Sequence, residues 1–471
     1  MERVTLRLIF DRVDYLNDVA EIPRAFSPYL HIDEESENYL EWHFSQLDNN
    51  FSINISSSIW ESKNFCTTVK AADFTEYKRI TKRFIKNSLY VYLSDVLHIS
   101  LPYGSLTGVR PTKMYYELSK NLADVKSYLC ENLFVSPKKA QLIENCVSNQ
   151  KNVINTDPKT VGVFLNIPFC PSRCSYCSFI STEVFRIRKE LPLYVECVKK
   201  ELNVLSEILQ KNGFSVGSIY VGGGTPTCIG ADNLSEFLKY LKDFGCEFTV
   251  EAGRPDTISE DYIKAFSVSN VTRISVNPQT FKQSTLDLIG RKHTLDDVYR
   301  CFELLRNTDF SINTDLIAGL PEESYDDFCD SIRKAIALSP DNITVHALSL
   351  KRGSVMTLNG DEKKEFGLTS AMIESAYELL SEAGFLPYYM YRQKNTADNL
   401  ENTGYCKPGK QCKYNVDMME EAAGIIAFGA GAMSKLIVGN RIERLSNPKG
   451  LREYCERIDD IVEKKRAFFG I

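Results

Sequence analysis

The sequence predicts an α/β protein in which parallel strands alternate with helices. Short apolar runs recur between residues 161 and 348, and amphipathic segments lie between them. A polar segment at residues 148–158 resembles a linker and separates this region from a first α/β unit. Because strands that alternate with helices form βαβ units with right-handed crossovers, we expect a parallel sheet covered by helices.

Residues 1–155 are predicted to form a separate N-terminal α/β domain. Residues 4–10 and 51–60 alternate apolar and polar side chains, as half-buried strands do. Residues 74–97 and 114–130 have helical periodicity, and Pro111 can open the second of these helices. No motif in this domain assigns it a role.

Residues 156–360 are predicted to form the next domain, which contains six strands. These strands span residues 161–167, 218–221, 247–251, 273–276, 311–317 and 342–348. Amphipathic segments such as 191–209 and 295–306 are the expected helices between them. Residues 361–471 are predicted to form a C-terminal α/β extension, with a helix at 369–383 and a glycine-rich, strand-like run at 424–433.

Composition excludes several classes of protein. The chain has 471 residues, a net charge of −6 and 14 cysteines. Its negative charge argues against general nucleic-acid binding, which needs a basic surface. No run of about 18 apolar residues occurs, so we expect no membrane span, and the first residues lack the core of a signal peptide. We therefore expect a cytoplasmic protein whose cysteines are reduced and serve as metal ligands or core residues.

Three closely spaced cysteines, Cys170, Cys174 and Cys177, follow the first of the six strands. A [4Fe–4S] cluster is normally held by four cysteines, so three thiolates leave one iron open to a small molecule. Zinc is the alternative, but zinc sites usually add a second cysteine pair or a histidine pair. None of the five histidines is near this loop in the sequence. The spacing therefore favours an open cluster.

The cysteine loop resembles that of the radical S-adenosylmethionine (SAM) enzymes. The flanking residues Ile167, Pro168, Phe169 and Tyr176 are similar to the branch that contains oxygen-independent coproporphyrinogen III oxidase. The segment 101–113 is typical of the HemZ-type members of that branch. The resemblance implies a partial (β/α)6 TIM-like barrel with its chemistry at the carboxyl ends of the strands. It also implies a [4Fe–4S] cluster whose open iron binds SAM, which is cleaved to a 5′-deoxyadenosyl radical.

Further residues near successive strand ends resemble the SAM contacts of this family. Gly223, Gly224 and Thr225 resemble the loop that binds the SAM amino group. Glu251 can accept both ribose hydroxyls, and Asp315 resembles the family's aspartate near the ribose. Gln279 can bind the adenosyl group, and Arg291 offers a planar fork suited to a carboxylate. The predicted cofactor-binding residues are Phe164, Gly223, Gly224, Thr225, Glu251, Gln279, Arg291 and Asp315. Among them, Phe164 stands where the oxidases have a tyrosine.

The resemblance implies oxidative decarboxylation of two propionates of coproporphyrinogen III, which gives protoporphyrinogen IX. A flavodoxin or ferredoxin-type protein is the expected electron donor. Lys351, Arg352, Arg392 and Lys394 could meet the propionates of this tetrapyrrole. Two alternatives stay open, because Phe179 replaces a fourth cysteine of the oxidases and matches haem chaperones. The chain could be such a chaperone, or a radical SAM enzyme that acts on another tetrapyrrole through haem degradation or methyl transfer.

Overall fold

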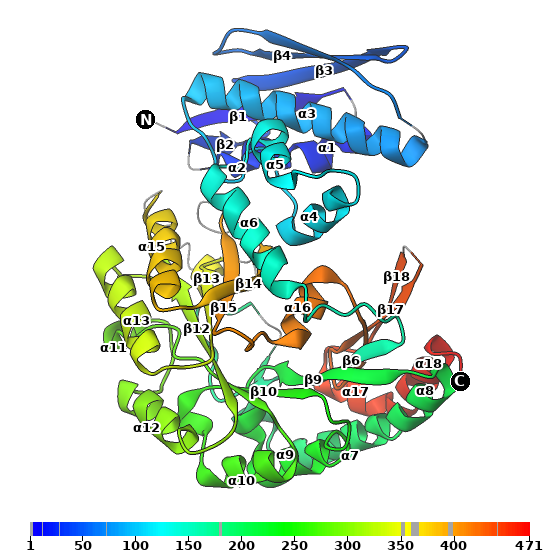
Figure 1. The fold of residues 1–471 in the computed structure, drawn as a ribbon, viewed down its shortest axis with the longest axis vertical. Coiled ribbons are helices and arrows are strands. Elements are labelled where there is room, and N and C mark those ends of the chain that lie inside the picture. The colour runs from blue at the N-terminus through cyan, green and yellow to red at the C-terminus, as the bar shows by residue number, and fades with distance from the viewer. Residues whose placement is uncertain are drawn as a thin grey trace. The chain divides into compact units, whose positions relative to one another are not determined.

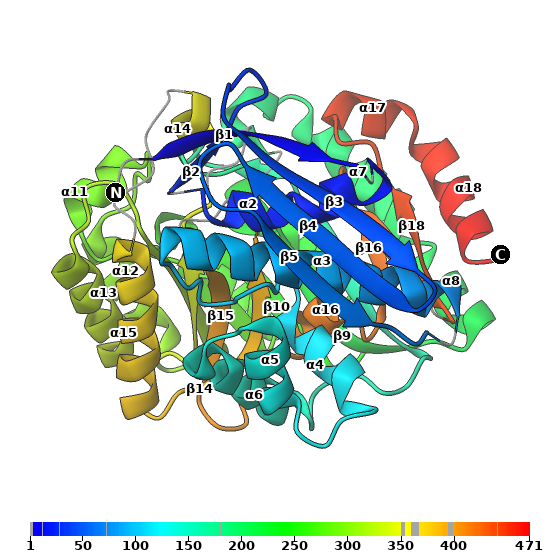
Figure 2. The same cartoon turned by 90° about the horizontal axis from the view of Figure 1, so that it is seen from above.

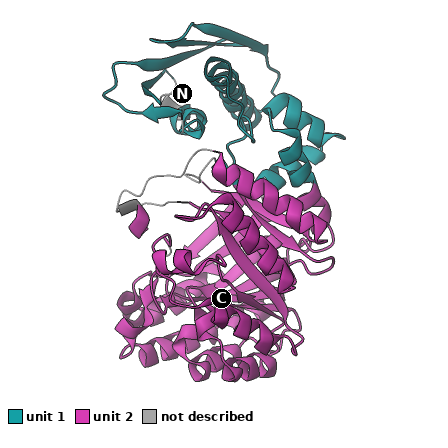
Figure 3. Cartoon of the chain, turned by 90° about the vertical axis from the view of Figure 1, so that its left-hand side faces the viewer, with its two compact units in different colours: residues 1–144, 398–400 teal, residues 145–397, 401–471 magenta. Residues whose placement is uncertain are grey.

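The computed structural model describes residues 3–11, 13–27, 29–71, 73–178, 181–349, 354–358, 367–393, 399–439 and 441–471. The chain forms two compact units, which Figure 3 colours separately. Unit 1 comprises residues 1–144 with 398–400, and unit 2 comprises residues 145–397 with 401–471. The boundary falls inside helix α6 (Pro137–Gln150), rather than at residue 155. The predicted barrel and C-terminal extension belong to one unit, because their strands join one sheet.

Unit 1 contains a five-stranded sheet with the order β2-β1-β3-β4-β5. Its strands are β1 (Val4–Phe10), β2 (Leu30–Ile32), β3 (Tyr39–Leu47), β4 (Asn50–Ser57) and β5 (Lys63–Thr68). Alternate residues of β3 point into the core, where Leu40 and Trp42 are fully buried. Helix α3 (Phe74–Leu97) packs on this sheet, as Figure 2 shows. The predicted strand at 51–60 and helix at 74–97 correspond to β4 and α3.

The remaining helices of unit 1 include a break that the periodicity does not reveal. Helices α1 (Val13–Val19) and α2 (Glu21–Ala25) follow β1. The single helix expected at 114–130 is two helices, α4 (Pro111–Ser119) and α5 (Val125–Leu133). The Asp124 carboxylate accepts the Ser127 backbone N–H at 2.9 Å and so caps a new helix. Pro111 opens α4, as the sequence predicts.

Unit 2 is built on an 11-stranded sheet in which six neighbouring strands are parallel. They are β6 (Thr160–Ile167), β9 (Ser215–Gly223), β10 (Glu247–Gly253), β11 (Arg273–Val276), β12 (Ser311–Ala318) and β13 (Asn342–Ala347). The six predicted strands match these six elements. Each strand is followed by one or more helices, so the unit contains the expected partial (β/α)6 arrangement.

The C-terminal segment extends this sheet at both ends. Its strands are β14 (Leu386–Arg392), β15 (Glu401–Cys406), β16 (Gly424–Phe428), β17 (Met433–Val438) and β18 (Arg441–Ser446). Strand β15 pairs antiparallel with β13, and β16 pairs parallel with β6. The run at 424–433 is therefore β16, a turn and the first residue of β17.

Helices cover the outer surface of the strands in unit 2 (Figure 1). They are α7 (Leu191–Leu202), α8 (Leu205–Asn212), α9 (Ala231–Leu238), α10 (Glu260–Val268), α11 (Gln283–Leu288), α12 (Leu295–Leu305), α13 (Tyr325–Ala337), α15 (Leu368–Glu382), α17 (Leu451–Glu456) and α18 (Ile458–Phe468). Helix α14 (Val355–Leu358) instead lies beside the cysteine loop, where the Met356 N–H donates to the Ser175 carbonyl. Helix α16 (Lys413–Glu420) packs on the inner side of the strands, where Tyr414 stacks on Tyr220. The helix predicted at 191–209 is split into α7 and α8. Among the described helices, none combines the length and apolar character that a membrane crossing requires.

A buried ion pair ties the last helix to the first helix of the barrel. Lys465 of α18 and Glu201 of α7 are both fully buried, and Lys465 Nζ lies 2.8 Å from Glu201 Oε1. The other carboxylate oxygen, Oε2, accepts the Tyr454 hydroxyl at 2.7 Å and the Gly429 N–H at 2.8 Å. Because both charges have several partners, this pair fixes the C-terminal segment against α7.

Candidate active site

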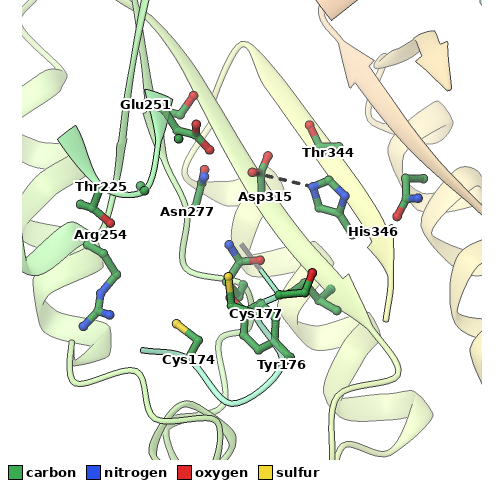
Figure 4. A pocket seen from close by; sticks show the side chains of 18 of the residues that line it. Cys174, Tyr176, Cys177, Thr225, Glu251, Arg254, Asn277, Asp315, Thr344 and His346 are labelled. Carbon is green, nitrogen blue, oxygen red and sulfur yellow. Dashed lines mark ion pairs between the residues drawn. The ribbon is translucent and has the colours of Figure 1, made fainter. Parts of the chain in front are cut away.

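A pocket of about 350 Å3 lies at the carboxyl ends of the parallel strands of unit 2. Ten of the eleven residues predicted from the sequence to hold the cofactors line it. They are Cys170, Cys174, Cys177, Gly223, Gly224, Thr225, Glu251, Gln279, Arg291 and Asp315. The eleventh, Phe164, is not among the lining residues and packs against the rings of Tyr220 and Tyr414. Figure 4 shows how labelled side chains from several strands converge on this pocket.

The cysteine loop is fixed by backbone hydrogen bonds on both of its sides. Its first residues form strand β7 (Phe169–Cys170), which pairs in parallel with β8 (Thr182–Glu183). The Ser175 N–H donates to the Ile289 carbonyl at 3.0 Å, and the Cys177 N–H donates to the Cys174 carbonyl at 3.1 Å. The loop therefore holds its thiols at one end of the pocket.

The three cysteines line one pocket, as the ligands of a single [4Fe–4S] cluster must. No group of three histidine, cysteine, aspartate or glutamate side chains in the described ranges is placed to hold a single ion. Each thiolate of a [4Fe–4S] cluster binds a different iron, so its ligands stand farther apart than those of one zinc ion. Burial raises the pKa of the Cys170 thiol, so ionisation of this thiol needs positive charge nearby, such as iron supplies.

The glycine loop passes too close to the cysteine loop for any side chain. The Gly224 N–H donates to the Ile167 carbonyl at 2.8 Å, and a Cβ at Gly224 would lie 2.3 Å from the Phe169 carbonyl oxygen. Gly223 has a φ of +108°, which residues other than glycine rarely adopt. The next residue, Thr225, places its hydroxyl 3.8 Å from Cys170 Sγ. The backbone of this loop is thus exposed to a ligand that also contacts the cysteine loop.

Two carboxylates and a histidine line the pocket beyond the cysteines. Burial, reinforced by the negative charge of Asp315, raises the pKa of Glu251 to about 7. Asp315 Oδ2 lies 3.8 Å from His346 Nε2, the contact drawn as a dashed line in Figure 4. The hydroxyl of Tyr391 lies 3.4 Å from the other ring nitrogen, Nδ1. The site can therefore accept hydroxyl groups at its carboxylates and exchange a proton at Glu251 near neutral pH.

Two amide side chains in the pocket have buried oxygens that accept no hydrogen bond from the described residues. These atoms are Gln279 Oε1 and Asn277 Oδ1. Gln279 also has a φ of +72°, while its backbone bonds to β12 through Asp315 and Ile317. A buried acceptor without a partner costs about 1–3 kcal/mol. A ligand with amino or hydroxyl donors would remove this cost, so the residues present fit an adenosyl group.

Arg291 is already committed to protein partners. It is 5% exposed, and its Nη2 atom donates to the carbonyls of Gly253 at 3.0 Å and Asn277 at 2.5 Å. Its Nη1 atom donates to the Tyr176 hydroxyl at 3.2 Å. Only part of its fork is therefore left for a ligand carboxylate. The predicted SAM-carboxylate role of Arg291 stays a prediction.

Sequence reasoning missed several residues that line the pocket. Arg254 follows β10, and its position just after a strand end was the available signal. His346 and Asn277 lie at the ends of β13 and β11, and no spacing pattern in the sequence points to them.

The residues predicted to meet a tetrapyrrole are only partly described. Tyr389, Tyr391 and Gln393 line the pocket, whereas Arg392 is not among the lining residues. Lys351, Arg352, Lys394 and Phe179 lie outside the described residues.

Comparison with known proteins agrees with this geometry. The model of the radical SAM superfamily matches residues 167–335. Over 416 residues the chain is 36% identical to the oxygen-independent coproporphyrinogen-III oxidase-like protein HemZ of Bacillus subtilis. This alignment covers 83% of this chain and 82% of the relative. Over 323 residues it is 27% identical to the heme chaperone HemW of Haemophilus influenzae, covering 65% of this chain and 80% of the relative.

A solved structure shares the fold. Coproporphyrinogen III oxidase (HemN) from Escherichia coli, a radical SAM enzyme, superimposes with a TM-score of 0.53. It is 18% identical in sequence, and the match covers 67% of this chain and 72% of that one. Proteins of this family bind a [4Fe–4S] cluster and SAM. The chain therefore belongs to the radical SAM superfamily, in its HemN, HemZ and HemW group.

Proposed function

We propose that this protein is a radical SAM oxidoreductase that decarboxylates coproporphyrinogen III to protoporphyrinogen IX without oxygen. The observation that carries the proposal is the 36% identity to a coproporphyrinogen-III oxidase-like protein over most of both chains. The pocket supports it, because the cysteine loop, the glycine loop and the strand-end carboxylates line one cavity.

The residues of the pocket divide the tasks of holding the cofactors. Cys170, Cys174 and Cys177 would hold the [4Fe–4S] cluster. The backbone of the glycine loop would meet the amino group of SAM, and Glu251 would accept its ribose hydroxyls. When bound, the cluster and SAM would supply a 5′-deoxyadenosyl radical able to remove one hydrogen atom from a substrate propionate. Formation of the vinyl group with release of carbon dioxide leaves one further electron, which an external one-electron acceptor would have to take.

The protein's own side chains would orient the bound nucleoside, and ligand binding would set the protonation state of Glu251. Gln279 and Asn277 offer buried acceptors that fix a bound nucleoside in one position. Ionised Glu251 accepts hydroxyl groups more strongly than its protonated form does, so binding favours the deprotonated carboxylate. Tyr389 and Tyr391 present rings and hydroxyls to the pocket, where a tetrapyrrole would lie.

The test is anaerobic turnover of the reconstituted protein with coproporphyrinogen III, SAM, a low-potential reductant and a one-electron acceptor. Loss of two molecules of carbon dioxide per porphyrinogen, seen by mass spectrometry of the product, is the expected result. Formation of 5′-deoxyadenosine without loss of carbon dioxide would mean a different tetrapyrrole reaction.

Haem chaperones are also relatives, at 27% identity for the one from Haemophilus influenzae. Stable binding of haem by the same preparation, with no turnover of porphyrinogen, would assign the chain to that function instead.

A further inference from the structure

Two buried arginines hold the cysteine loop, one on each side of Cys174. Arg254 Nη1 donates to the Ser172 hydroxyl at 3.1 Å, and Arg291 Nη1 donates to the Tyr176 hydroxyl at 3.2 Å. Ser172 lies between the first two cysteines, and Tyr176 lies between the last two. Arg254 is the new element, because neither the sequence motifs nor the comparisons assign it a role.

The charge of Arg254 is poorly screened. Its side chain is 3% exposed, whereas its counter-ion Asp256, 3.1 Å away, is 27% exposed. Water screens the carboxylate more than the guanidinium, so the pair presents net positive potential to its buried side. Arg254 lines the same pocket as Cys170 and Cys174.

Among the described residues, no acidic side chain other than Asp256 forms an ion pair with Arg254. His293 is fully buried, and burial together with Arg291 and Arg254 lowers its pKa to about 3, so it stays neutral. Arg291 adds a second cation. The hydrogen bond to Ser172, which is two residues from both Cys170 and Cys174, keeps the Arg254 guanidinium beside the cysteine loop.

We propose that Arg254 raises the reduction potential of the cluster held by Cys170, Cys174 and Cys177, and positions the cysteine loop through Ser172. Reduction adds one electron, and therefore one negative charge, to the cluster. A fixed cation nearby stabilises the reduced form more than the oxidised form, because net charge and the groups around the sulfurs set the potential of such clusters. The electron comes from a one-electron donor of low potential.

This inference rests on the cluster site and not on the proposed porphyrinogen reaction. It is tested with the full chain, reconstituted anaerobically, without SAM and without substrate. The cluster is titrated with dithionite in the presence of mediators, and the reduced state is followed by electron paramagnetic resonance. Failure of the decarboxylation assay would leave this result unaffected.

Three variants separate charge from hydrogen bonding. Arg254→Gln removes the charge and should shift the midpoint potential to a more negative value. Arg254→Lys keeps the charge and should leave the potential close to that of the wild type. Ser172→Ala removes the loop contact and should lower the iron bound per chain while changing the potential little.

A variant that should shift the potential in the opposite direction distinguishes a charge effect from general disruption of the fold. Asp256→Asn removes the counter-charge from a partly exposed position and should shift the potential to a more positive value. Arg300→Gln is the matched control, because its guanidinium is 58% exposed and its loss removes the same formal charge from the surface. If Arg254→Gln and Asp256→Asn shift the potential no more than Arg300→Gln does, or shift it in the same direction as each other, the proposed role of Arg254 is wrong. If Arg254→Gln retains no cluster, the sign of the Asp256→Asn shift alone decides.

Discussion

Replacing Glu251 by glutamine should change how the stability of the ligand-free protein depends on pH. Burial and the charge of Asp315 raise the pKa of this carboxyl to about 7 in the folded protein, against an ordinary value of 4.5. The folded state therefore binds the proton more tightly than the unfolded state does. For this group, stability is highest below pH 4.5 and is lost as the pH rises towards 7, which is the reverse of a salt-bridged carboxylate.

The size of the effect follows from these two pKa values. Relative to low pH, where Glu251 is protonated in both states, proton linkage at this group lowers the free energy of unfolding. The loss is about 0.8 kcal/mol at pH 5 and about 3.3 kcal/mol at pH 8. The free energy of unfolding of the wild type, compared with Glu251→Gln, should therefore fall by about 2.5 kcal/mol between these pH values. Water in the pocket reaches part of this side chain and reduces the effect, so this value is an upper bound.

The assay is urea unfolding of the cluster-free protein at pH 5 and pH 8, followed by circular dichroism. All other titrating groups are common to both proteins and cancel in the comparison. Glu260→Gln, an exposed change at the start of α10, is the control and should not alter the difference between the two pH values. If the difference in free energy of unfolding between wild type and Glu251→Gln is the same at both pH values, the pKa of Glu251 is not raised in the folded protein.

Three further predictions concern packing and ligand contacts. Gly224→Ala brings a Cβ to 2.3 Å from the Phe169 carbonyl oxygen, so it should displace the glycine loop, lower stability by about 1–3 kcal/mol and abolish SAM binding in equilibrium dialysis. Gly108→Ala is the control, because a Cβ at this exposed glycine would meet only Leu106 Cδ1, at an ordinary distance of 3.9 Å. Gln279→Leu removes a buried oxygen that has no partner among the described residues, so the ligand-free protein should keep its melting temperature. The same change removes an acceptor for the adenosyl group, so SAM affinity should fall about 5- to 30-fold in isothermal titration. Lys465→Met leaves Glu201 buried without its cation and should lower the free energy of unfolding in urea by about 3–5 kcal/mol. An unchanged unfolding midpoint would contradict the structural role of this pair.

Much of the site could be predicted because parallel strands end at one edge of their sheet. Cys170, Gly224 and Glu251 come near the ends of successive strands, so any sheet built from these βαβ units brings them together. The same argument does not find their partners. Arg254 meets Ser172 across 82 residues of sequence, and this pairing depends on how the loops fold over the strand ends.

The C-terminal strands could not be placed in advance for a related reason. Local patterns identify the strand-like run that contains β16, but they do not say which strand it pairs with. Its parallel pairing with β6 joins segments more than 250 residues apart, and the antiparallel β15 breaks the βα repeat. Phe164 shows the same limit within one strand. Its ring contacts Tyr220 and Tyr414, and the second of these comes from the C-terminal segment.

The distribution of charge along the pocket bears on how SAM would enter it. Arg254 and Arg291 contact the cysteine loop, whereas Glu251 and Asp315 lie on β10 and β12 (Figure 4). SAM has a carboxylate on its methionine part and hydroxyls on its ribose. With the carboxylate towards the arginines, each group meets a favourable partner, whereas the reverse orientation places it beside two carboxyl groups. If SAM binds with its carboxylate towards the arginines, Arg254→Gln should weaken SAM binding in equilibrium dialysis as well as lower the potential, and unchanged binding would contradict this orientation.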